Sequence, residues 1–344
     1  MTQSIEQFVQ ALPKAELHLH LEGAVAAPTV IDLAKKHGIP LPELHDVSDL
    51  FNFPDLATFL KVYDLVCRAI RDTSDFHRIT YEALAVCARD GARYVEFFFS
   101  PNAHLAYGVA YATMLDGIVR GMHDAERDLK LKSRLIPAHN RELGLDRGMA
   151  FLDMVLADRR DEVIGIGLDY GERHHPPAPY KPMYDRARAA GLRVTAHAGE
   201  DGPADNVRHA LKVLHCERID HGYHVIDDPG LMAEACASGI CFTCCPTTTL
   251  NTTVWRDLAS PDHAIRRMVE GGLTVMLNTD DPGLFRTTLN QEYTLVMRHM
   301  DFSRETMREL TLNGLKGSWL DETTKRDWTK QWRGEIDALL AGGG

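Results

Sequence analysis

The 344-residue sequence lacks the long apolar stretch that a membrane-spanning helix requires. A bilayer core needs about 20 consecutive, mostly apolar residues, and no such run occurs here. Residues 1–10 contain a glutamate and show no basic segment followed by an apolar one, which argues against a signal peptide. We therefore expect a cytoplasmic protein with no membrane partner.

Positive charge is also in short supply. The chain has 38 lysines and arginines against 49 aspartates and glutamates, which gives a formal net charge of -11 and a pI near 5.8. A field of this sign repels polyanions. Nucleic acids are therefore excluded as expected partners, and a small molecule is the better expectation. Nothing in the sequence specifies an oligomeric state.

Cysteines are few and irregularly spaced. Their number, seven, is odd, and their spacing does not form a disulfide framework. Reduced thiols in a cytosolic protein explain this pattern most simply. Low-complexity sequence is absent except for Gly342–Gly344, which is typical of a frayed terminus.

What the sequence does contain is a recurring pair of patterns: a short β-rich apolar run followed by a helix-compatible stretch. Such alternation predicts a parallel sheet, and eight repeats without a linker predict closure into a (β/α)₈ TIM barrel, with residues 1–344 forming a single domain. The clearest helices are predicted at Pro182–Ala190 and Ala204–Leu214. The eight expected strands are Ala15–His20, Arg93–Ser100, Ser133–His139, Val163–Asp169, Arg193–His197, Arg218–His221, Ile240–Cys245 and Leu273–Asp280.

The gap after the first expected strand is longer than one crossover helix needs, and it predicts a helical lid insertion over about residues 22–90. Helices are expected around Pro28–His37 and Leu56–Ile70, joined by Asp46–Pro54. An insertion after a barrel strand lies at the C-terminal face, where it can cover a pocket. The aromatic residues that either line this lid or pack its helices together are Phe51, Phe53, Phe59 and Tyr63.

Candidate chemical groups gather at the ends of the expected strands. The first strand ends in His18-Leu19-His20, and residues two apart on a strand point to the same face, which is a metal-ligand arrangement. Further titratable groups close the fifth, sixth and eighth strands in His197-Ala198-Gly199-Glu200, Asp220-His221-Gly222 and Asn278-Thr279-Asp280-Asp281-Pro282. Barrel enzymes place their chemistry at this end. Core histidines or helix caps explain any one of these groups, but not all of them together.

These segments, together with Pro13–Gly23, resemble the motif set of the adenosine and adenine deaminases within the metal-dependent amidohydrolases. The motifs occur in the family's order and extend from Pro13 to about Phe285. The resemblance implies one Zn²⁺ per chain, bound by His18, His20, His197 and Asp280, with a position left for water.

The same resemblance implies the roles of the reacting groups. Hydroxide adds to C6 of the purine, and Glu200 donates a proton to N1, a role that burial of its carboxyl group favours by raising its pKa. His221 orients and deprotonates the water, and Asp281 hydrogen-bonds N7. Loss of ammonia then gives the 6-oxo purine.

Substrate features divide between two subgroups of this family. Glu22 stands where adenosine deaminases usually have an aspartate for the ribose 5′-hydroxyl, and Tyr170 or Gly171 stands near the position that contacts N3. Glu22 and the segment Gly167–Pro177 resemble the adenine deaminases, whereas Tyr223-His224 and Thr287-Thr288 resemble the adenosine deaminases. The sequence accordingly predicts adenosine or 2′-deoxyadenosine as substrate, with adenine or another substituted adenine as the alternative.

Other metal enzymes fit less well. His20-Leu21-Glu22 matches half of the cytidine-deaminase signature, but the partner P-C-x-x-C is missing. Cys241 and Cys244, three apart in a strand, face opposite sides and are better explained as buried structural thiols. The cluster Arg134, His139, Asn140 and Arg141 is a candidate either for substrate contact or for hydrogen bonding at the barrel rim. Another mononuclear metal amidohydrolase remains a more distant alternative, and a non-enzymatic binding protein requires neither the acid nor the base.

Overall fold

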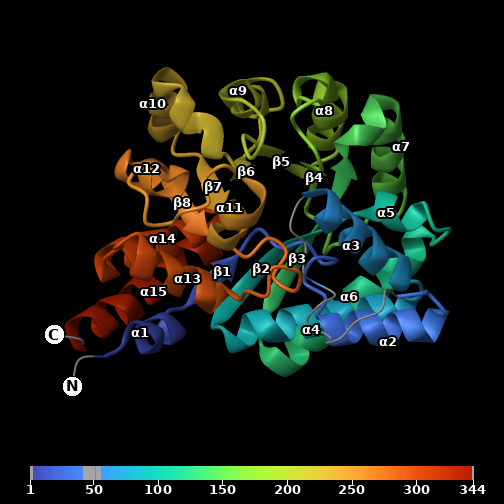
Figure 1. Cartoon of the computed structure of the whole chain (residues 1–344), viewed down its shortest axis with the longest axis horizontal. Coiled ribbons are helices and arrows are strands. Elements are labelled where there is room, and N and C mark those ends of the chain that lie inside the picture. Colours follow the sequence, from blue (N-terminus) through green and yellow to red (C-terminus); the bar gives the residue numbers. More distant parts are fainter. Residues whose placement is uncertain (1–2, 42–50, 52–55, 343–344) are drawn as a thin grey trace.

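Eight parallel strands hydrogen-bond in sequential order and curl into a nearly closed barrel surrounded by helices (Figure 1). The computed structural model describes residues 3–41, 51 and 56–342. The predicted (β/α)₈ barrel is thus confirmed. The strands are β1 (Lys14–Glu16), β2 (Ala92–Phe99), β3 (Lys132–Asn140), β4 (Gly165–Asp169), β5 (Arg193–Ala198), β6 (Arg218–His221), β7 (Cys241–Cys244) and β8 (Thr274–Leu277).

The barrel closes where the first and last strands meet. The amide of His20 donates to the carbonyl of Asp280, and the amide of Asp280 donates to the carbonyl of His18, both at 2.8 Å. Side chains interrupt the regular ladder just before this point: Asn278 Oδ1 accepts the amide of Leu17 at 2.9 Å, and Glu16 Oε1 accepts that of His18 at 3.1 Å. The first strand is therefore shorter than predicted, although its path continues through residue 20.

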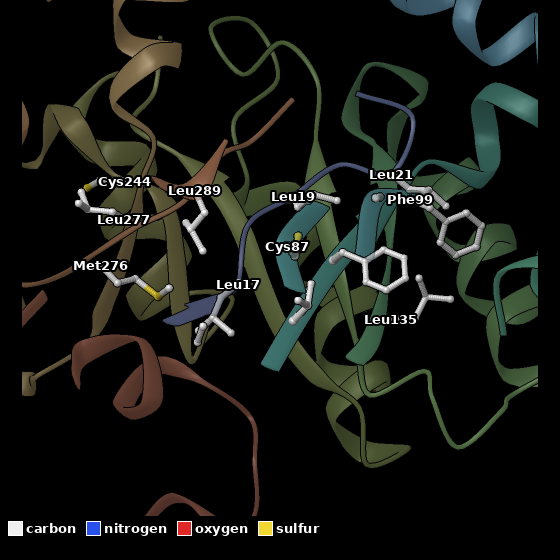
Figure 2. Packing of buried hydrophobic residues seen from close by; sticks show 14 of the residues in the cluster. Leu17, Leu19, Leu21, Cys87, Phe99, Leu135, Cys244, Met276, Leu277 and Leu289 are labelled. Carbon is white, nitrogen blue, oxygen red and sulfur yellow. The ribbon is translucent and has the colours of Figure 1, made fainter. Parts of the chain in front are cut away.

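Side chains of residues 17–21, just after β1, point alternately to two different environments. Leu17, Leu19 and Leu21 are buried, and Figure 2 shows them among hydrophobic side chains that include Leu289, Cys87 and Phe99. Residues at every second position share one face of an extended chain. The intervening His18 and His20 therefore face the barrel interior.

The helices pack around the barrel (Figure 1), and the two for which the sequence pattern is clearest lie within two residues of their predicted bounds. Short 3₁₀ segments occur at Arg141–Leu143, Ala178–Tyr180 and Tyr223–Asp227. The α-helices are α1 (Ile5–Ala11), α2 (Ala27–His37), α3 (Leu56–Ala69), α4 (Thr73–Arg89), α5 (Pro101–Leu105), α6 (Tyr111–Leu129), α7 (Gly144–Ala157), α8 (Lys181–Ala189), α9 (Ala204–Lys212), α10 (Pro229–Ser238), α11 (Pro246–Thr252), α12 (Ala264–Glu270), α13 (Leu289–His299), α14 (Arg304–Gly317) and α15 (Glu322–Gly342).

Among the described residues between β1 and β2, the structure has three helices. Of these, α4 packs against β2 and α6 and so serves as the crossover helix, whereas α2 and α3 are additional. Lys36 and His37 at the end of α2 each lie 2.6 Å from a carboxylate oxygen of Asp75 in α4, which attaches the additional helices to the barrel wall. The predicted connection Asp46–Pro54, including Phe53, lies outside the described residues apart from Phe51, which is buried.

Two further features concern the helices and the cysteines. In the described part of the chain, no helix combines the length and apolarity needed to cross a membrane. All seven cysteines are free thiols, and Cys241 and Cys244 are buried as predicted.

Candidate metal centre and active site

The predicted metal ligands meet at the C-terminal end of the barrel. Ligand atoms of His18, His197, His221 and Asp280 all lie within 4.8 Å of one another. His20 joins this group, because its Nε2 lies 3.0 Å from His197 Nε2 and 3.5 Å from Asp280 Oδ1. The structure therefore brings together every residue predicted to bind metal, and His221 with them.

The two carboxylate oxygens of Asp280 lie near different members of this cluster. Oδ1 lies 3.4 Å from His18 Nε2 and 3.5 Å from His20 Nε2. Ligands of one tetrahedral zinc, at about 2.0–2.1 Å from the ion, lie about 3.3 Å apart. Oδ2 instead accepts the hydroxyl of Thr248 at 2.8 Å and lies 3.8 Å from His221 Nε2. The spacing favours His20 over His221 as the third imidazole ligand.

A hydrogen-bonded chain sets the tautomer of His18. Thr243 Oγ1 donates to Asp220 Oδ1 at 3.2 Å, so it accepts from His18 Nδ1, which lies 2.7 Å away. The proton of His18 is therefore on Nδ1, and its Nε2 carries a free lone pair. This Nε2 is buried and has no hydrogen-bond partner among the residues that the structure describes. A buried, unpartnered lone pair beside a carboxylate and two imidazoles fits a metal ligand.

Electrostatics keep the ligands in their binding forms. Burial lowers the pKa values of His18, His20 and His197, so the imidazoles are neutral near pH 7. Burial alone raises the pKa of Asp280, but the neighbouring His18, His221 and His20 outweigh it and hold the pKa below its usual range. Neutral imidazole and ionised carboxylate are the forms that bind metal.

Phe98 forms the floor beneath these histidines, a role for which the sequence carries no signal beyond a buried strand. Its ring stacks on His20 at a centroid distance of 5.0 Å and meets the edges of His18 and His197 at 5.3 and 5.4 Å. An apolar floor excludes water from below and leaves the barrel mouth as the open side.

Left-handed backbone turns aim the side chains that follow the strands. His221 has φ 65° and Asp280 has φ 63°, a conformation that costs a non-glycine residue on the order of 1–3 kcal/mol and clusters at functional sites. The turn at Asp280 brings Asp281 to the cavity as well. Gly23 makes room for it, since a Cβ at Gly23 would lie 1.7 Å from Asp281 Oδ1. Burial, followed by the charge of Asp280, raises the pKa of Asp281 well above its usual value.

Glu200 and His221 are neighbours in the lining of the cavity. Glu200 Oε2 lies 3.5 Å from His221 Nε2, and Glu200 Oε1 accepts the hydroxyl of Thr252 at 2.9 Å. Burial raises the pKa of Glu200. Burial alone lowers the pKa of His221, but the carboxylates of Glu200 and Asp280 outweigh it and raise the pKa. An acid and a base thus stand side by side next to the candidate metal centre.

A small cavity of about 170 Å³ opens above this cluster. Pockets for drug-sized ligands usually measure about 300–1,000 Å³. Aromatic rings cover it: Phe59 of α3 stacks on Phe285 at 5.3 Å, and Tyr63 meets Tyr170 edge to face at 6.1 Å. Phe59 and Tyr63 therefore line the lid, whereas Phe51 does not border this cavity.

Glu22, the predicted contact for ribose, lies behind the cavity wall. It is fully buried, and the cavity lining does not include it. Its Oε1 accepts the amide of Ser100 at 3.0 Å and Nε2–H of His104 at 2.8 Å, while the Tyr63 hydroxyl lies 3.5 Å from Oε2. Burial raises the pKa of Glu22, but His104 outweighs it and holds the pKa below its usual value. An ionised carboxylate occupied in this way does not point to a ribose hydroxyl.

Tyr170 and Gly171, the predicted neighbours of N3, both line the cavity. Tyr170 has φ 65°, and its ring contributes to the aromatic cover. The amide of Gly171 donates to Glu142 Oε1 at 3.2 Å, so this N–H already has a protein acceptor.

Sequence patterns alone do not identify the support for the loop that carries Glu200. Glu172, which is 2% exposed, accepts the amides of Gly199, Asp201 and Gly202 at 2.9, 3.1 and 2.6 Å. These amides flank Glu200 on both sides. The only signal in the sequence is an acidic residue shortly after the fourth strand.

Arg141 contacts Glu172 and so helps to hold it in place. It is fully buried, lies 3.5 Å from Glu172, and donates to the carbonyls of Leu168, Asp169 and His197. Of the two roles open to Arg141 from sequence, hydrogen bonding within the barrel is therefore the one observed.

The fold and the site together indicate a class of protein: a barrel enzyme whose C-terminal face carries a cluster of candidate metal ligands, with Glu200 and His221 beside it. The adenosine deaminase family model matches residues 13–332. The chain is 38% identical over 323 residues to an adenine deaminase of Sphingopyxis alaskensis, covering 92% of this chain and 93% of that protein.

Solved structures agree. A zinc-bound amidohydrolase from Burkholderia ambifaria is 38% identical, with TM-score 0.92 over 98% of this chain and 94% of that one. Adenine deaminase from Arthrobacter aurescens is 32% identical, with TM-score 0.89 over 96% and 99%. The chain belongs to the adenosine deaminase family, a purine-type aminohydrolase branch of the metal-dependent amidohydrolases, which confirms the resemblance.

The hydrogen bonds of Glu172 generate a prediction about the position of Glu200. Glu172→Gln replaces one acceptor oxygen by a donor that faces amide N–H groups, so the loop shifts and Glu200, the predicted proton donor, moves with it. We expect kcat to fall roughly 10- to 100-fold, because small misplacements of a catalytic group cost up to about 10²-fold, and the basic limb of the pH–rate profile to move.

The matched control is Asp205→Asn at the exposed start of α9, which should leave kcat and the pH profile unchanged. An unaltered pH profile and kcat in Glu172→Gln, with bound metal equal to wild type, would contradict the positioning role.

Proposed function

We propose that this protein is a zinc-dependent adenine aminohydrolase, which converts adenine and water to hypoxanthine and ammonia. The observation that carries the choice of substrate is the small, aromatic-covered cavity, behind whose wall the candidate ribose-binding carboxylate is already occupied. The adenine deaminases to which the chain is 32–38% identical support the same choice.

The donor set fits one zinc ion per chain. Three imidazole nitrogens and one carboxylate oxygen are available: His20 Nε2 lies 3.0 Å from His197 Nε2, and Asp280 Oδ1 lies 3.4 and 3.5 Å from His18 Nε2 and His20 Nε2. The Nε2 of His18 is a buried lone pair with no partner among the described residues. Three histidines and one aspartate suit Zn²⁺ and leave room for a further ligand. His18, His20, His197 and Asp280 hold the ion, which when bound supplies a nucleophilic hydroxide near neutral pH.

Each remaining group has a task set by its environment. His221 donates Nδ1–H to the Tyr223 hydroxyl at 3.3 Å, because that hydroxyl donates to the Cys245 carbonyl. Its Nε2 lone pair is then directed to the cavity, where it accepts a proton from water. Glu200, whose pKa burial raises, donates a proton to N1 and so relieves the loss of aromaticity when C6 is attacked. Asp281, whose pKa is raised by burial and then by the charge of Asp280, hydrogen-bonds N7.

The residues that resemble adenosine deaminases have scaffold partners instead of cavity positions. The Tyr223 hydroxyl bonds the backbone of Cys245, and Thr287 donates to Glu292. His224 pairs with Asp227. None of them lines the cavity as the described residues form it. This arrangement supports adenine, the alternative of the sequence analysis, over adenosine.

The choice of substrate predicts the activity profile of the wild-type enzyme. We expect kcat/KM for adenine to exceed that for adenosine and 2′-deoxyadenosine by at least about 10³-fold, because sites that exclude or mismatch polar groups reach discrimination of this order. Ultraviolet absorbance during conversion of each 6-amino purine to its 6-oxo product measures all three. Faster turnover of adenosine than of adenine would contradict the proposal.

The assigned proton donor generates a second prediction. Glu200→Gln keeps the size of the side chain but cannot deliver a proton, so kcat should fall about 10²–10⁴-fold, the usual contribution of general acid catalysis. Elemental analysis should find about one zinc per chain in both proteins. Near-normal turnover by the variant, or a parallel loss of zinc, would rule Glu200 out as the donor.

A further inference from the structure

Asp169 ends β4 inside the cavity, and no reaction step described above uses it. It is 3% exposed and belongs to the cavity lining. Its Oδ2 accepts the Ser100 hydroxyl at 3.1 Å, which fixes the carboxylate plane. Its Oδ1 is buried and has no hydrogen-bond partner within the described ranges.

A buried acceptor without a partner is costly to folding, and native structures usually show a reason for it. Among the carboxylates around this cavity, Glu200 is bonded by Thr252 and Asp280 by Thr248. Only Asp281 and Asp169 have a buried oxygen that no described group satisfies. In the proposed reaction Asp281 is paired with N7 of the purine, whereas no atom of the substrate is paired with Asp169.

The position of Asp169 indicates which part of the ligand it meets. The candidate metal ligands, the acid, the base and the N7 donor lie at or just beyond the ends of β1, β5, β6 and β8. Asp169 is instead the last residue of β4 and bonds Ser100, which follows β2. A purine with C6 at the metal centre, N1 at Glu200 and N7 at Asp281 turns its N3–N9 edge away from the metal. That edge contains one donor in free adenine, the N9–H group.

We propose that Asp169 accepts a hydrogen bond from N9–H of the purine and thereby selects the free base over N9-substituted purines. This inference rests on adenine as the substrate. A nucleoside has no N9–H, so Asp169 stays unpaired when it binds, and the sugar carbon on N9 occupies the space against the carboxylate. Both effects act against the nucleoside and neither acts against the base.

Ser100 makes this acceptor rigid. Its amide donates to Glu22, its hydroxyl donates to Asp169, and the Tyr63 hydroxyl lies 3.3 Å from the same oxygen. Glu22, which the resemblance assigns to ribose recognition, thus positions Ser100 by accepting its amide. Ser100 in turn positions Asp169 by donating its hydroxyl to it. Base selection is in this way connected to the lid helix α3, which carries Tyr63.

The test compares adenine with 9-methyladenine, which differs from it only by replacing N9–H with N–CH₃. Three variants are measured: Asp169→Ala, which removes the acceptor; Asp169→Asn, whose amide oxygen can still accept; and the control Asp205→Asn, an exposed acid in α9 that does not line the cavity. Zinc content and melting temperature are recorded for each.

For Asp169→Ala we expect kcat/KM for adenine to fall roughly 10- to 100-fold, the value of one hydrogen bond to a charged group, mainly through KM. The rate with 9-methyladenine should stay equal or rise, so the preference for the base collapses. Asp169→Asn should retain most of the preference, and the control all of it.

Equal losses with both substrates in Asp169→Ala would overturn the inference, since they indicate a structural role only, as would an unchanged preference. In both cases the wild-type enzyme still deaminates adenine and the proposed function stands. Wild-type protein that is inactive with adenine would contradict the proposed function and this inference together.

Discussion

Two backbone hydrogen bonds at the seam of the barrel hold the first and last strands in register, and the site depends on them. They join Asp280 to His18 and His20, so the closure of the sheet and the assembly of the metal ligands are the same event. A slip of one residue along this seam would turn the histidines out of the barrel and Leu17, Leu19 and Leu21 into it. The apolar packing of those leucines therefore opposes any other register. Hydrophobic burial at the barrel wall in this way fixes the positions of the candidate metal ligands at the barrel mouth.

Buried carboxylates set the positions of the groups around this seam. Glu172 gathers the amides beside Glu200, and Glu22 gathers Ser100 and His104. A buried charge is costly unless hydrogen bonds satisfy it, so each of these acids specifies one loop conformation more strongly than apolar packing does. Burying these acids costs free energy of folding, but in return it holds the loops in the geometry that the reaction needs. A site preorganised in this way has to reorganise less when it reacts.

The sequence predicts some parts of this site well and others poorly, for a physical reason. His18, His20, His197, His221 and Asp280 are predictable because strand periodicity and barrel topology bring strand ends to one face regardless of detailed packing. The bounds of α8 and α9 follow from similar local patterns. Glu22 and Gly171 are assigned to substrate from sequence, yet their polar groups have protein partners, since hydrogen-bond partners from distant segments leave no local pattern. Glu172 and Phe98 escape prediction because contacts with distant segments leave no local pattern, and for the same reason the sequence leaves Arg141 between two roles. The long gap after the first strand predicts a helical insertion, and the structure has α2 and α3 there, but which aromatic rings face the cavity depends on how α3 packs.

We propose that His18, His20, His197 and Asp280 share one zinc ion while Glu200, Asp281 and Asp169 bind the edges of a free purine base. A crystal structure of the zinc-loaded protein with hypoxanthine tests all of this at once. We expect one ion bound by those four residues, with His221 outside the coordination sphere, and the base with N1 at Glu200, N7 at Asp281 and N9 at Asp169. An ion bound by His221 in place of His20, or a base with N9 turned towards the metal, would contradict it.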